Sequence, residues 1–182
     1  MLEDRKLVGR LKCGDADALR AIYDKYESDL LTLAANLVSD PVTAEDIVQD
    51  VFIGLVRSAS RLRLRRSLRA YLATAVANRA RDEYRRQSRR RTSSLEEAEH
   101  VPAGWEDGPV QMVIDSEQMH RVRQGLMELP YEQREVLMLR MHGDMKFRQI
   151  AAHQGISIKT AISRYQYGLN KLRSMLNGEV SQ

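Results

Sequence analysis

Apolar residues recur at every third or fourth position along most of this chain, and this spacing restricts the folds that it can adopt. Between residues 15 and 38, for example, the spacing is kept by Leu19, Ile22, Tyr26 and Leu30. Such a pattern is typical of a long amphipathic helix, whereas a half-buried strand alternates apolar and polar residues. No such alternation stands out, and the chain is therefore predicted to be all-α.

The same spacing predicts a series of helices along the chain. They are expected at residues 3–12, 15–38, 42–58, 67–90, 115–129, 132–141, 146–154 and 158–176. Thr43 and Asp46 form a weak capping box at the start of the third helix. Val56 is expected on the buried face of that helix.

Residues 92–115 interrupt the periodicity. They contain six acidic residues and no basic one, together with Pro102, Gly104, Gly108 and Pro109. Proline and glycine disfavour helices, so this segment is predicted to be an acidic flexible linker. The chain then divides into two small helical domains, at residues 1–91 and 116–182, each with a modest core.

The formal net charge of +4 hides a strong segregation of charge along the chain. Residues 57–91 carry 13 arginines, no lysine and two acidic residues, whereas residues 1–56 carry a net charge of −5. A basic segment of this density attracts a polyanion, and arginine both forks onto phosphates and stacks on bases. Nucleic acid is therefore the favoured partner, and a solvated basic helix face is the alternative.

The last two predicted helices, with the turn between them, have the pattern of a helix-turn-helix motif. Ile150 and Ala151 are expected to pack beneath the turn, Gly155 gives the turn its backbone freedom, and Ser157 is suited to cap the final helix. The second helix of such a motif enters the major groove and contacts DNA near its N-terminal end. The polar residues at that end are Lys159, Thr160, Ser163 and Arg164. An ordinary three-helix bundle is the alternative.

Several classes of protein do not fit the sequence. No apolar run is long enough for a transmembrane helix, and charges of both signs at the N-terminus disfavour a signal peptide, so a cytoplasmic protein is expected.

Cys13 is the single cysteine and is expected to be a small packing residue. The histidines are scattered without cysteine partners, so no metal or other cofactor is expected. They are expected to be incidental surface residues: His100, His120, His142 and His153. The sequence lacks a catalytic constellation and a glycine-rich phosphate loop, so neither an enzyme nor a small-molecule substrate is expected, and a nuclease with paired acids is the weakest alternative.

Three stretches of the sequence, in this order, carry a family resemblance. They are AEDIVQDVF at 44–52, LRAYL at 68–72 continuing to ANRARDEYRR at 77–86, and LPYEQREVL at 129–137 followed by FRQIA at 147–151 and GIS at 155–157. They resemble region 2.2, regions 2.3 and 2.4, and region 4 of the extracytoplasmic-function (ECF) group of bacterial sigma factors. The resemblance covers residues 5–176 and implies an RNA polymerase sigma factor with an N-terminal region 2 and a C-terminal region 4.

The resemblance also implies a role for each stretch. Region 2.2 docks on a basic coiled coil of the polymerase β′ subunit, and the matching residues are Glu45, Asp46, Gln49 and Asp50. An acidic cluster stabilised by the helix macrodipole is the alternative for this set. Regions 2.3 and 2.4 melt the −10 promoter element and hold its bases, with Asn78, Arg79, Asp82 and Arg85 and the loop residues Arg61, Arg63, Arg65 and Arg66 as candidates. Region 4 contacts the β flap and reads the −35 element as duplex DNA, with Lys159, Thr160, Ser163 and Arg164 as candidates.

Four arginines stand in a loop where the family tends to have glycine and serine, so the −10 base preference is not predicted. The acidic linker is expected to imitate an RNA in its channel, through Glu96, Glu97, Glu99, Glu106 and Asp107. An anti-sigma factor is expected to regulate the protein in trans, and a membrane-bound one would hold it at the membrane.

A free-standing helix-turn-helix regulator is the alternative function. This alternative predicts a dimer on a palindromic site. Nothing in the sequence, however, resembles a ligand pocket or phospho-acceptor domain.

Overall fold

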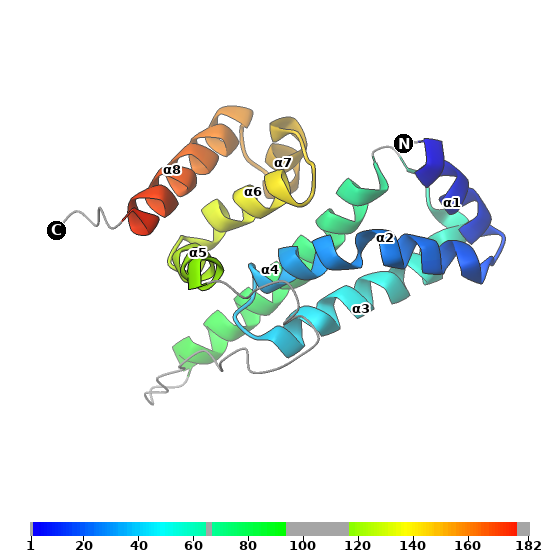
Figure 1. The fold of residues 1–182 in the computed structure, drawn as a ribbon, viewed down its shortest axis with the longest axis horizontal. Coiled ribbons are helices and arrows are strands. Elements are labelled where there is room, and N and C mark those ends of the chain that lie inside the picture. The colour runs from blue at the N-terminus through cyan, green and yellow to red at the C-terminus, as the bar shows by residue number, and fades with distance from the viewer. Residues whose placement is uncertain (1, 65–66, 94–116, 178–182) are drawn as a thin grey trace.

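The computed structural model describes residues 2–64, 67–93 and 117–177, and every regular element within these ranges is a helix. The N-terminal part contains α1 (Leu2–Lys12), α2 (Ala16–Ala35), α3 (Pro41–Ser58), the 3-10 helix η1 (Ala59–Arg61) and α4 (Leu68–Ser93). The C-terminal part contains α5 (Glu117–Met127), α6 (Tyr131–Met141), α7 (Phe147–Gln154) and α8 (Ile158–Leu176) (Figure 1). The predicted all-α fold is confirmed. Helix α4 continues two residues into the predicted linker, the rest of which lies outside the described residues.

The helix-turn-helix forms as its sequence predicts. Gly155 ends α7 with a φ of 69°, in the left-handed region that glycine adopts readily. The Ser157 hydroxyl then accepts the backbone N–H of Thr160 at 3.0 Å and caps α8. Ile150 and Ala151 are buried under this turn. The start of α8 is thus fixed by local hydrogen bonds and a small apolar core.

The start of α3 differs from the prediction. The cap is Asp40, whose carboxylate accepts the backbone N–H of Thr43 at 2.8 Å, rather than the predicted box of Thr43 and Asp46. The helix begins at Pro41, one residue earlier than expected, because proline is well tolerated in a first turn. That shift moves the capping position to Asp40 and leaves Asp46 on the helix surface.

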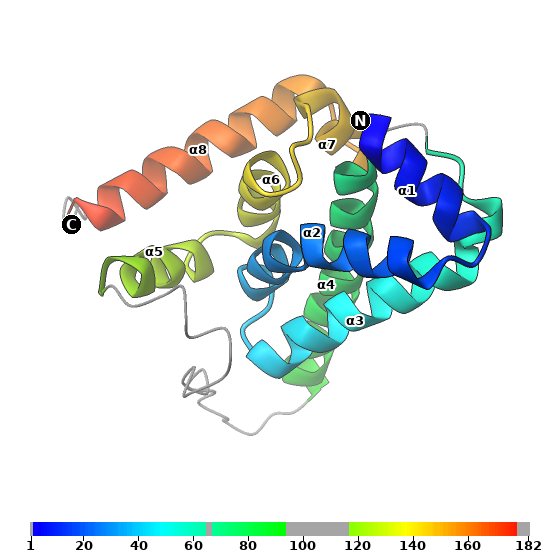
Figure 2. The same ribbon diagram turned by 45° about the vertical axis from the view of Figure 1, so that its right-hand side comes forward.

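Helix α4 is packed on two sides. Helices α2 and α3 both contact α4, and Leu68, Leu72 and Val76 of α4 are fully buried. Helix α6 contacts another side, so α4 runs between the N-terminal helices and the C-terminal part (Figure 2). Helix α8 packs on α5, α6 and α7, and lies on the side of these helices away from α2 and α3. One apolar cluster continues through both parts.

The contacts between the N-terminal helices and the C-terminal part are close. The rings of Tyr84 and Tyr131 are stacked with centroids 4.4 Å apart. The Arg134 guanidinium donates to the backbone carbonyl of Leu37 at 3.3 Å. In the turn between α6 and α7, a Cβ added to Gly143 would lie 3.0 Å from the Cβ of Ala73 in α4. A residue without a side chain is therefore required at this approach.

Replacing Gly143 with alanine is expected to destabilise the protein by about 1–3 kcal/mol, the usual range for overpacking. The new Cβ would lie 2.6 Å from the Leu139 carbonyl oxygen as well as against Ala73. The control is Gly54→Ala in α3, where an added Cβ meets nothing within 4 Å and should raise stability by about 0.5–1 kcal/mol. Urea unfolding of both variants measures the difference; a Gly143→Ala protein as stable as the unsubstituted chain would contradict this packing.

Candidate nucleic-acid interface

The first candidate surface is the outward face of α3. Asp46, Gln49 and Asp50 are exposed on it and Glu45 is half-buried, while Ile47 and Val48 turn inward. The spacing of three and four residues places the exposed side chains on one face of the helix. The four residues predicted to dock on polymerase therefore form a contiguous polar strip, which agrees with the prediction but does not test their role.

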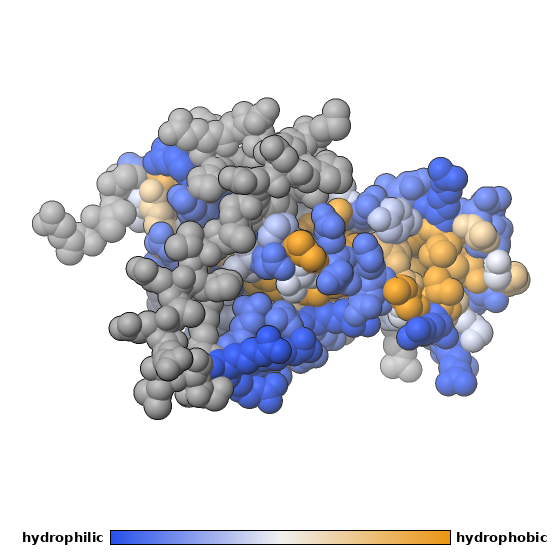
Figure 3. All heavy atoms as spheres, turned by 90° about the horizontal axis from the view of Figure 1, so that it is seen from below, coloured by the Kyte–Doolittle hydropathy of each residue, from blue (hydrophilic) through white to orange (hydrophobic). Residues whose placement is uncertain are grey.

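Two apolar residues extend this strip. Ile53 and Val56 are 47% and 46% exposed, and both follow Gln49 at helical spacing. The expectation that Val56 is buried is therefore wrong: the helix has no neighbour on that side among the described residues, so a residue at position 56 faces outward. The face that carries α3 is largely hydrophilic, with hydrophobic area gathered toward one end (Figure 3). An exposed apolar pair beside acidic residues is typical of a protein-binding surface.

The second candidate surface is the third side of α4, which neither α6 nor the N-terminal helices cover. Asn78, Arg79, Asp82 and Arg85 are all exposed there. Before α4, Arg61 at the end of η1 and Arg63 in the following loop are exposed on either side of the buried Leu62. Arg65 and Arg66 lie outside the described residues. Helix α4 thus presents two exposed arginines, Arg79 and Arg85, and the amide of Asn78, and such side chains contact phosphates and base edges in nucleic-acid complexes.

The first two surfaces meet at one ion pair. The Arg79 Nη1 lies 2.6 Å from the Asp50 Oδ2, and Nη2 donates to the Asp50 backbone carbonyl at 3.3 Å. Both side chains are about half exposed. A candidate polymerase contact and a candidate DNA contact therefore lie side by side, which the sequence spacing of 29 residues does not reveal.

The third candidate surface is the N-terminal end of α8. Lys159 and Thr160 are exposed, and Ser163 and Arg164 are half-buried. The Arg164 Nη1 donates to the Gln154 Oε1 at 2.8 Å. All four predicted residues thus lie on the first two turns of α8, but Arg164 is tied to α7.

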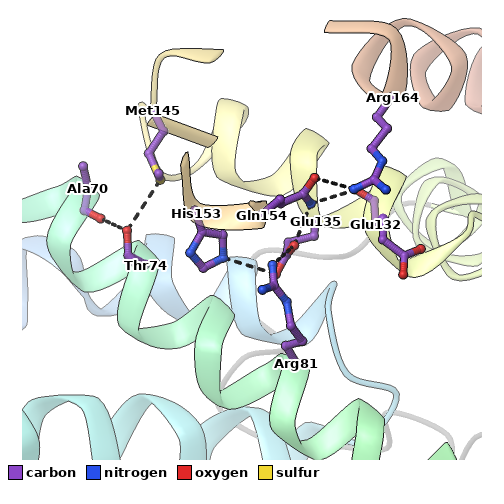
Figure 4. Close-up of polar contacts among 9 residues, drawn as sticks. All are labelled: Ala70, Thr74, Arg81, Glu132, Glu135, Met145, His153, Gln154 and Arg164. Carbon is purple, nitrogen blue, oxygen red and sulfur yellow. Dashed lines mark hydrogen bonds and ion pairs between the residues drawn. The ribbon is translucent and has the colours of Figure 1, made fainter. Parts of the chain in front are cut away.

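A buried polar network behind this surface was not predicted. Glu135 of α6 is fully buried, and its Oε2 accepts Arg81 Nη2 of α4 at 2.5 Å and Gln154 Nε2 at 2.6 Å (Figure 4). Its Oε1 lies 3.4 Å from the His153 Nε2. Burial alone raises the pKa of a carboxyl, but the contacts from His153, Arg81 and Gln154 hold the pKa of Glu135 below its usual value. A buried, ionised carboxylate thus joins the two parts of the chain.

Expectations for the histidines and the cysteine need correction. The His153 side chain is only 3% exposed and belongs to this network, so it is not an incidental surface residue. His142 is half-buried with its Nδ1 3.9 Å from the Asp29 Oδ1, and burial, together with the charge of Arg69, lowers the pKa of His142. The side chains of His100 and His120 lie outside the described part. Cys13 is exposed, not packed, because it follows the end of α1.

Within the described ranges no group of three or more histidine, cysteine, aspartate or glutamate side chains is placed to hold a metal ion. None of the helices described there is both long and apolar enough to cross a membrane.

Residues 22–90 match the family described as Sigma-70 region 2, and residues 119–172 match Sigma-70, region 4. The chain belongs to the sigma-70 family. It is 27% identical to the RNA polymerase sigma factor CarQ of Myxococcus xanthus, over 92% of this chain and 94% of that protein. It is 28% identical to the ECF RNA polymerase sigma factor SigK of Mycobacterium sp. (strain KMS), over 89% of this chain and 84% of that protein. The resemblance predicted from the sequence is confirmed, and the chain is an RNA polymerase sigma factor.

Two solved structures share the fold. CnrH, solved in complex with the cytosolic domain of CnrY, matches with a TM-score of 0.67 and 22% identity, over 97% of this sigma factor and 98% of CnrH. RpoE of Bartonella quintana, solved in complex with the anti-sigma factor NepR, matches with a TM-score of 0.65 and 23% identity, over 90% of this chain and 98% of RpoE.

Replacing Glu135 with glutamine is expected to destabilise this sigma factor by about 3 kcal/mol near neutral pH, because the Arg81 charge loses its buried partner. The pKa of Glu135 is lower in the folded than in the unfolded chain. Its contribution to stability is therefore complete above the unfolded value of about 4.5, and disappears as the pH falls through the folded value. Urea unfolding of the unsubstituted chain and Glu135→Gln between pH 7 and pH 3 should show a shrinking difference. The exposed Glu132→Gln is the control, and a difference independent of pH would contradict an ionised Glu135.

Proposed function

We propose that this sigma factor binds core RNA polymerase through α3, holds the melted −10 element on α4 and reads the duplex −35 element with α8. The observation that carries the proposal is the placement of these surfaces. The polar strip of α3 adjoins the ridge of α4 through Asp50 and Arg79, while the capped end of α8 lies on a separate helix-turn-helix. A free-standing helix-turn-helix regulator does not account for the match to region 2.

The polymerase contact follows from charge and shape. The carboxylates of Asp46 and Asp50 complement a basic partner, here the coiled coil of the β′ subunit. Glu45 precedes these two residues and Gln49 lies between them in the sequence. Ile53 and Val56 add apolar area next to them. Region 4 makes the second polymerase contact, with the β flap. Two separate contacts raise the overall affinity because the second becomes intramolecular.

The DNA contacts divide between the two regions. Asn78 has both a donor and acceptors for the edge of an unpaired base, and Arg79, Arg85 and the loop arginines neutralise the backbone around it. On α8, Arg164 has the planar fork that matches guanine O6 and N7 in the major groove. Lys159, Thr160 and Ser163 supply the phosphate and base contacts around it.

The remaining proposals concern regulation. We propose that an anti-sigma factor binds this protein in trans, as expected from the sequence. The related structure of the sigma factor RpoE in complex with the anti-sigma factor NepR supports this. The protein is proposed to act in the bacterial cytoplasm, held at the membrane only where its anti-sigma factor is anchored there. The residues of the acidic linker lie outside the described part, and their role as an RNA mimic stays a prediction.

Run-off transcription with bacterial core polymerase tests the function directly. Adding this protein to core polymerase and genomic promoter fragments is expected to produce defined start sites that are absent without it. Asp46→Lys together with Asp50→Lys should abolish them, because both carboxylates of the strip become cationic, whereas Asp24→Lys on α2 should not. Tight duplex binding without start sites would favour the free-standing regulator.

Substitutions in the two DNA-binding regions should separate their roles. Arg164→Ala is expected to reduce transcription from intact duplex promoters about tenfold or more, the discrimination given by one bidentate arginine contact. It should have less effect on templates that are already melted at −10. Asn78→Ala should retain most activity at −35 but lose its preference among melted −10 sequences. Equal losses from both variants on both templates would contradict this division.

A further inference from the structure

The side chain of Arg164 is held before any DNA arrives. Its Nη1 donates to the Gln154 Oε1 at 2.8 Å across the turn of the helix-turn-helix. Among the described residues, Gln154 is the hydrogen-bond partner of the Arg164 side chain, so the other N–H groups of Arg164 remain available. An arginine bound to guanine needs two of its donors. The contact with Gln154 therefore leaves enough donors for a base.

Gln154 is itself fixed by α6. Its Nε2 donates to the Glu135 Oε2 at 2.6 Å and to the Glu132 carbonyl oxygen at 3.1 Å. Because a carboxylate and a carbonyl only accept and a guanidinium only donates, a single amide orientation satisfies all three partners. In that orientation the acceptor of Gln154 faces Arg164 (Figure 4).

The base of this arrangement is rigid. Glu135 is fully buried and is bound by Arg81 from α4 and His153 from α7. Gln154 is the last residue of α7, directly before the left-handed Gly155. Gln154 thus lies between a fixed carboxylate and the first turns of α8, where a base-reading side chain must be placed.

We propose that Gln154 is a positioning residue, which pre-orients Arg164 for one base pair of the −35 element. The proposal rests on the proposed role of α8 in reading −35 DNA. A long arginine side chain loses considerable rotamer entropy when it binds, and a neighbour that already restricts it reduces this loss. Gln154 carries no charge, so it acts on discrimination between base pairs and not on general attraction to the phosphates.

The test uses Gln154→Ala, Arg164→Ala and the double variant in the full chain. Binding is measured to a duplex carrying the −35 element of a promoter mapped by run-off transcription, and to duplexes with each base pair substituted. Arg164→Ala is expected to reduce discrimination at one base pair about tenfold or more. Gln154→Ala should reduce discrimination at the same base pair about threefold to tenfold, since pre-orientation supports only part of that contact.

The double variant decides between positioning and a structural role. If Gln154 acts through Arg164, the double variant discriminates no worse than Arg164→Ala alone. If the two losses add, Gln154 acts by another route and the proposal is overturned. The slope of affinity against salt should stay unchanged in Gln154→Ala, because Gln154 carries no charge.

Two further variants separate positioning from the stability of α7. Gln149→Ala removes a glutamine from the same helix, where its Oε1 accepts the Lys146 backbone N–H at 2.8 Å and does not touch Arg164. It should leave discrimination intact, and an equal loss would overturn the proposal. Gln154→Met keeps the shape of the side chain without its hydrogen bonds and should behave like Gln154→Ala. If the unsubstituted chain does not discriminate −35 sequences at all, the role proposed for α8 fails. If the unsubstituted chain discriminates and both Gln154→Ala and Gln154→Met discriminate equally well, only the positioning role fails.

Discussion

The arrangement of this sigma factor depends on one buried carboxylate. Glu135 is withdrawn from water, and leaving such a charge unpaired costs several kcal/mol. Contacts with three side chains keep it ionised. These partners come from two other helices: Arg81 from α4, and His153 and Gln154 from α7. These helices must therefore be brought to α6 together. Hydrogen bonds of 2.5–2.6 Å do not tolerate small shifts, whereas an apolar face does. The carboxylate therefore restricts the position of region 4 on region 2 more strictly than apolar packing alone.

Helix α4 is the element on which the regions are assembled, because its surface divides into three sides. Leu72 and Val76 are fully buried in this helix, which α2 and α3 contact, and Arg81 and Tyr84 contact α6. The third side carries Asn78 and Arg85, exposed. The two buried sides fix the direction of the third, so the candidate −10 ridge is rigid although it lies on the surface. A site on a packed helix holds its side chains more precisely than one on a loop.

The sequence predicts the helices well because their ends are set locally. Gly155 and Ser157 determine the turn before α8, and the observed bounds of that helix match the predicted range. The sequence does not predict which polar residues are buried, because that depends on contacts between positions far apart. Glu135 and Arg81 are 54 residues apart, and either would read alone as a surface charge. Val56 shows the converse: its helical phase is compatible with a core position, but no neighbour among the described residues covers it.

Two kinds of ion pair in this molecule have different consequences. The pair of Asp50 and Arg79 is about half exposed, and such pairs contribute only about 0–1 kcal/mol. Polymerase can therefore bind Asp50, and DNA can bind Arg79, at little cost in stability. Both residues lie on the surfaces proposed to bind these partners. The pair of Glu135 and Arg81 is buried and shared with Gln154, so exchanging its partners would leave a charge unpaired in the interior. Exchangeable contacts lie where ligands are proposed to bind, and the persistent contact lies behind Arg164, where a fixed support is useful for recognition.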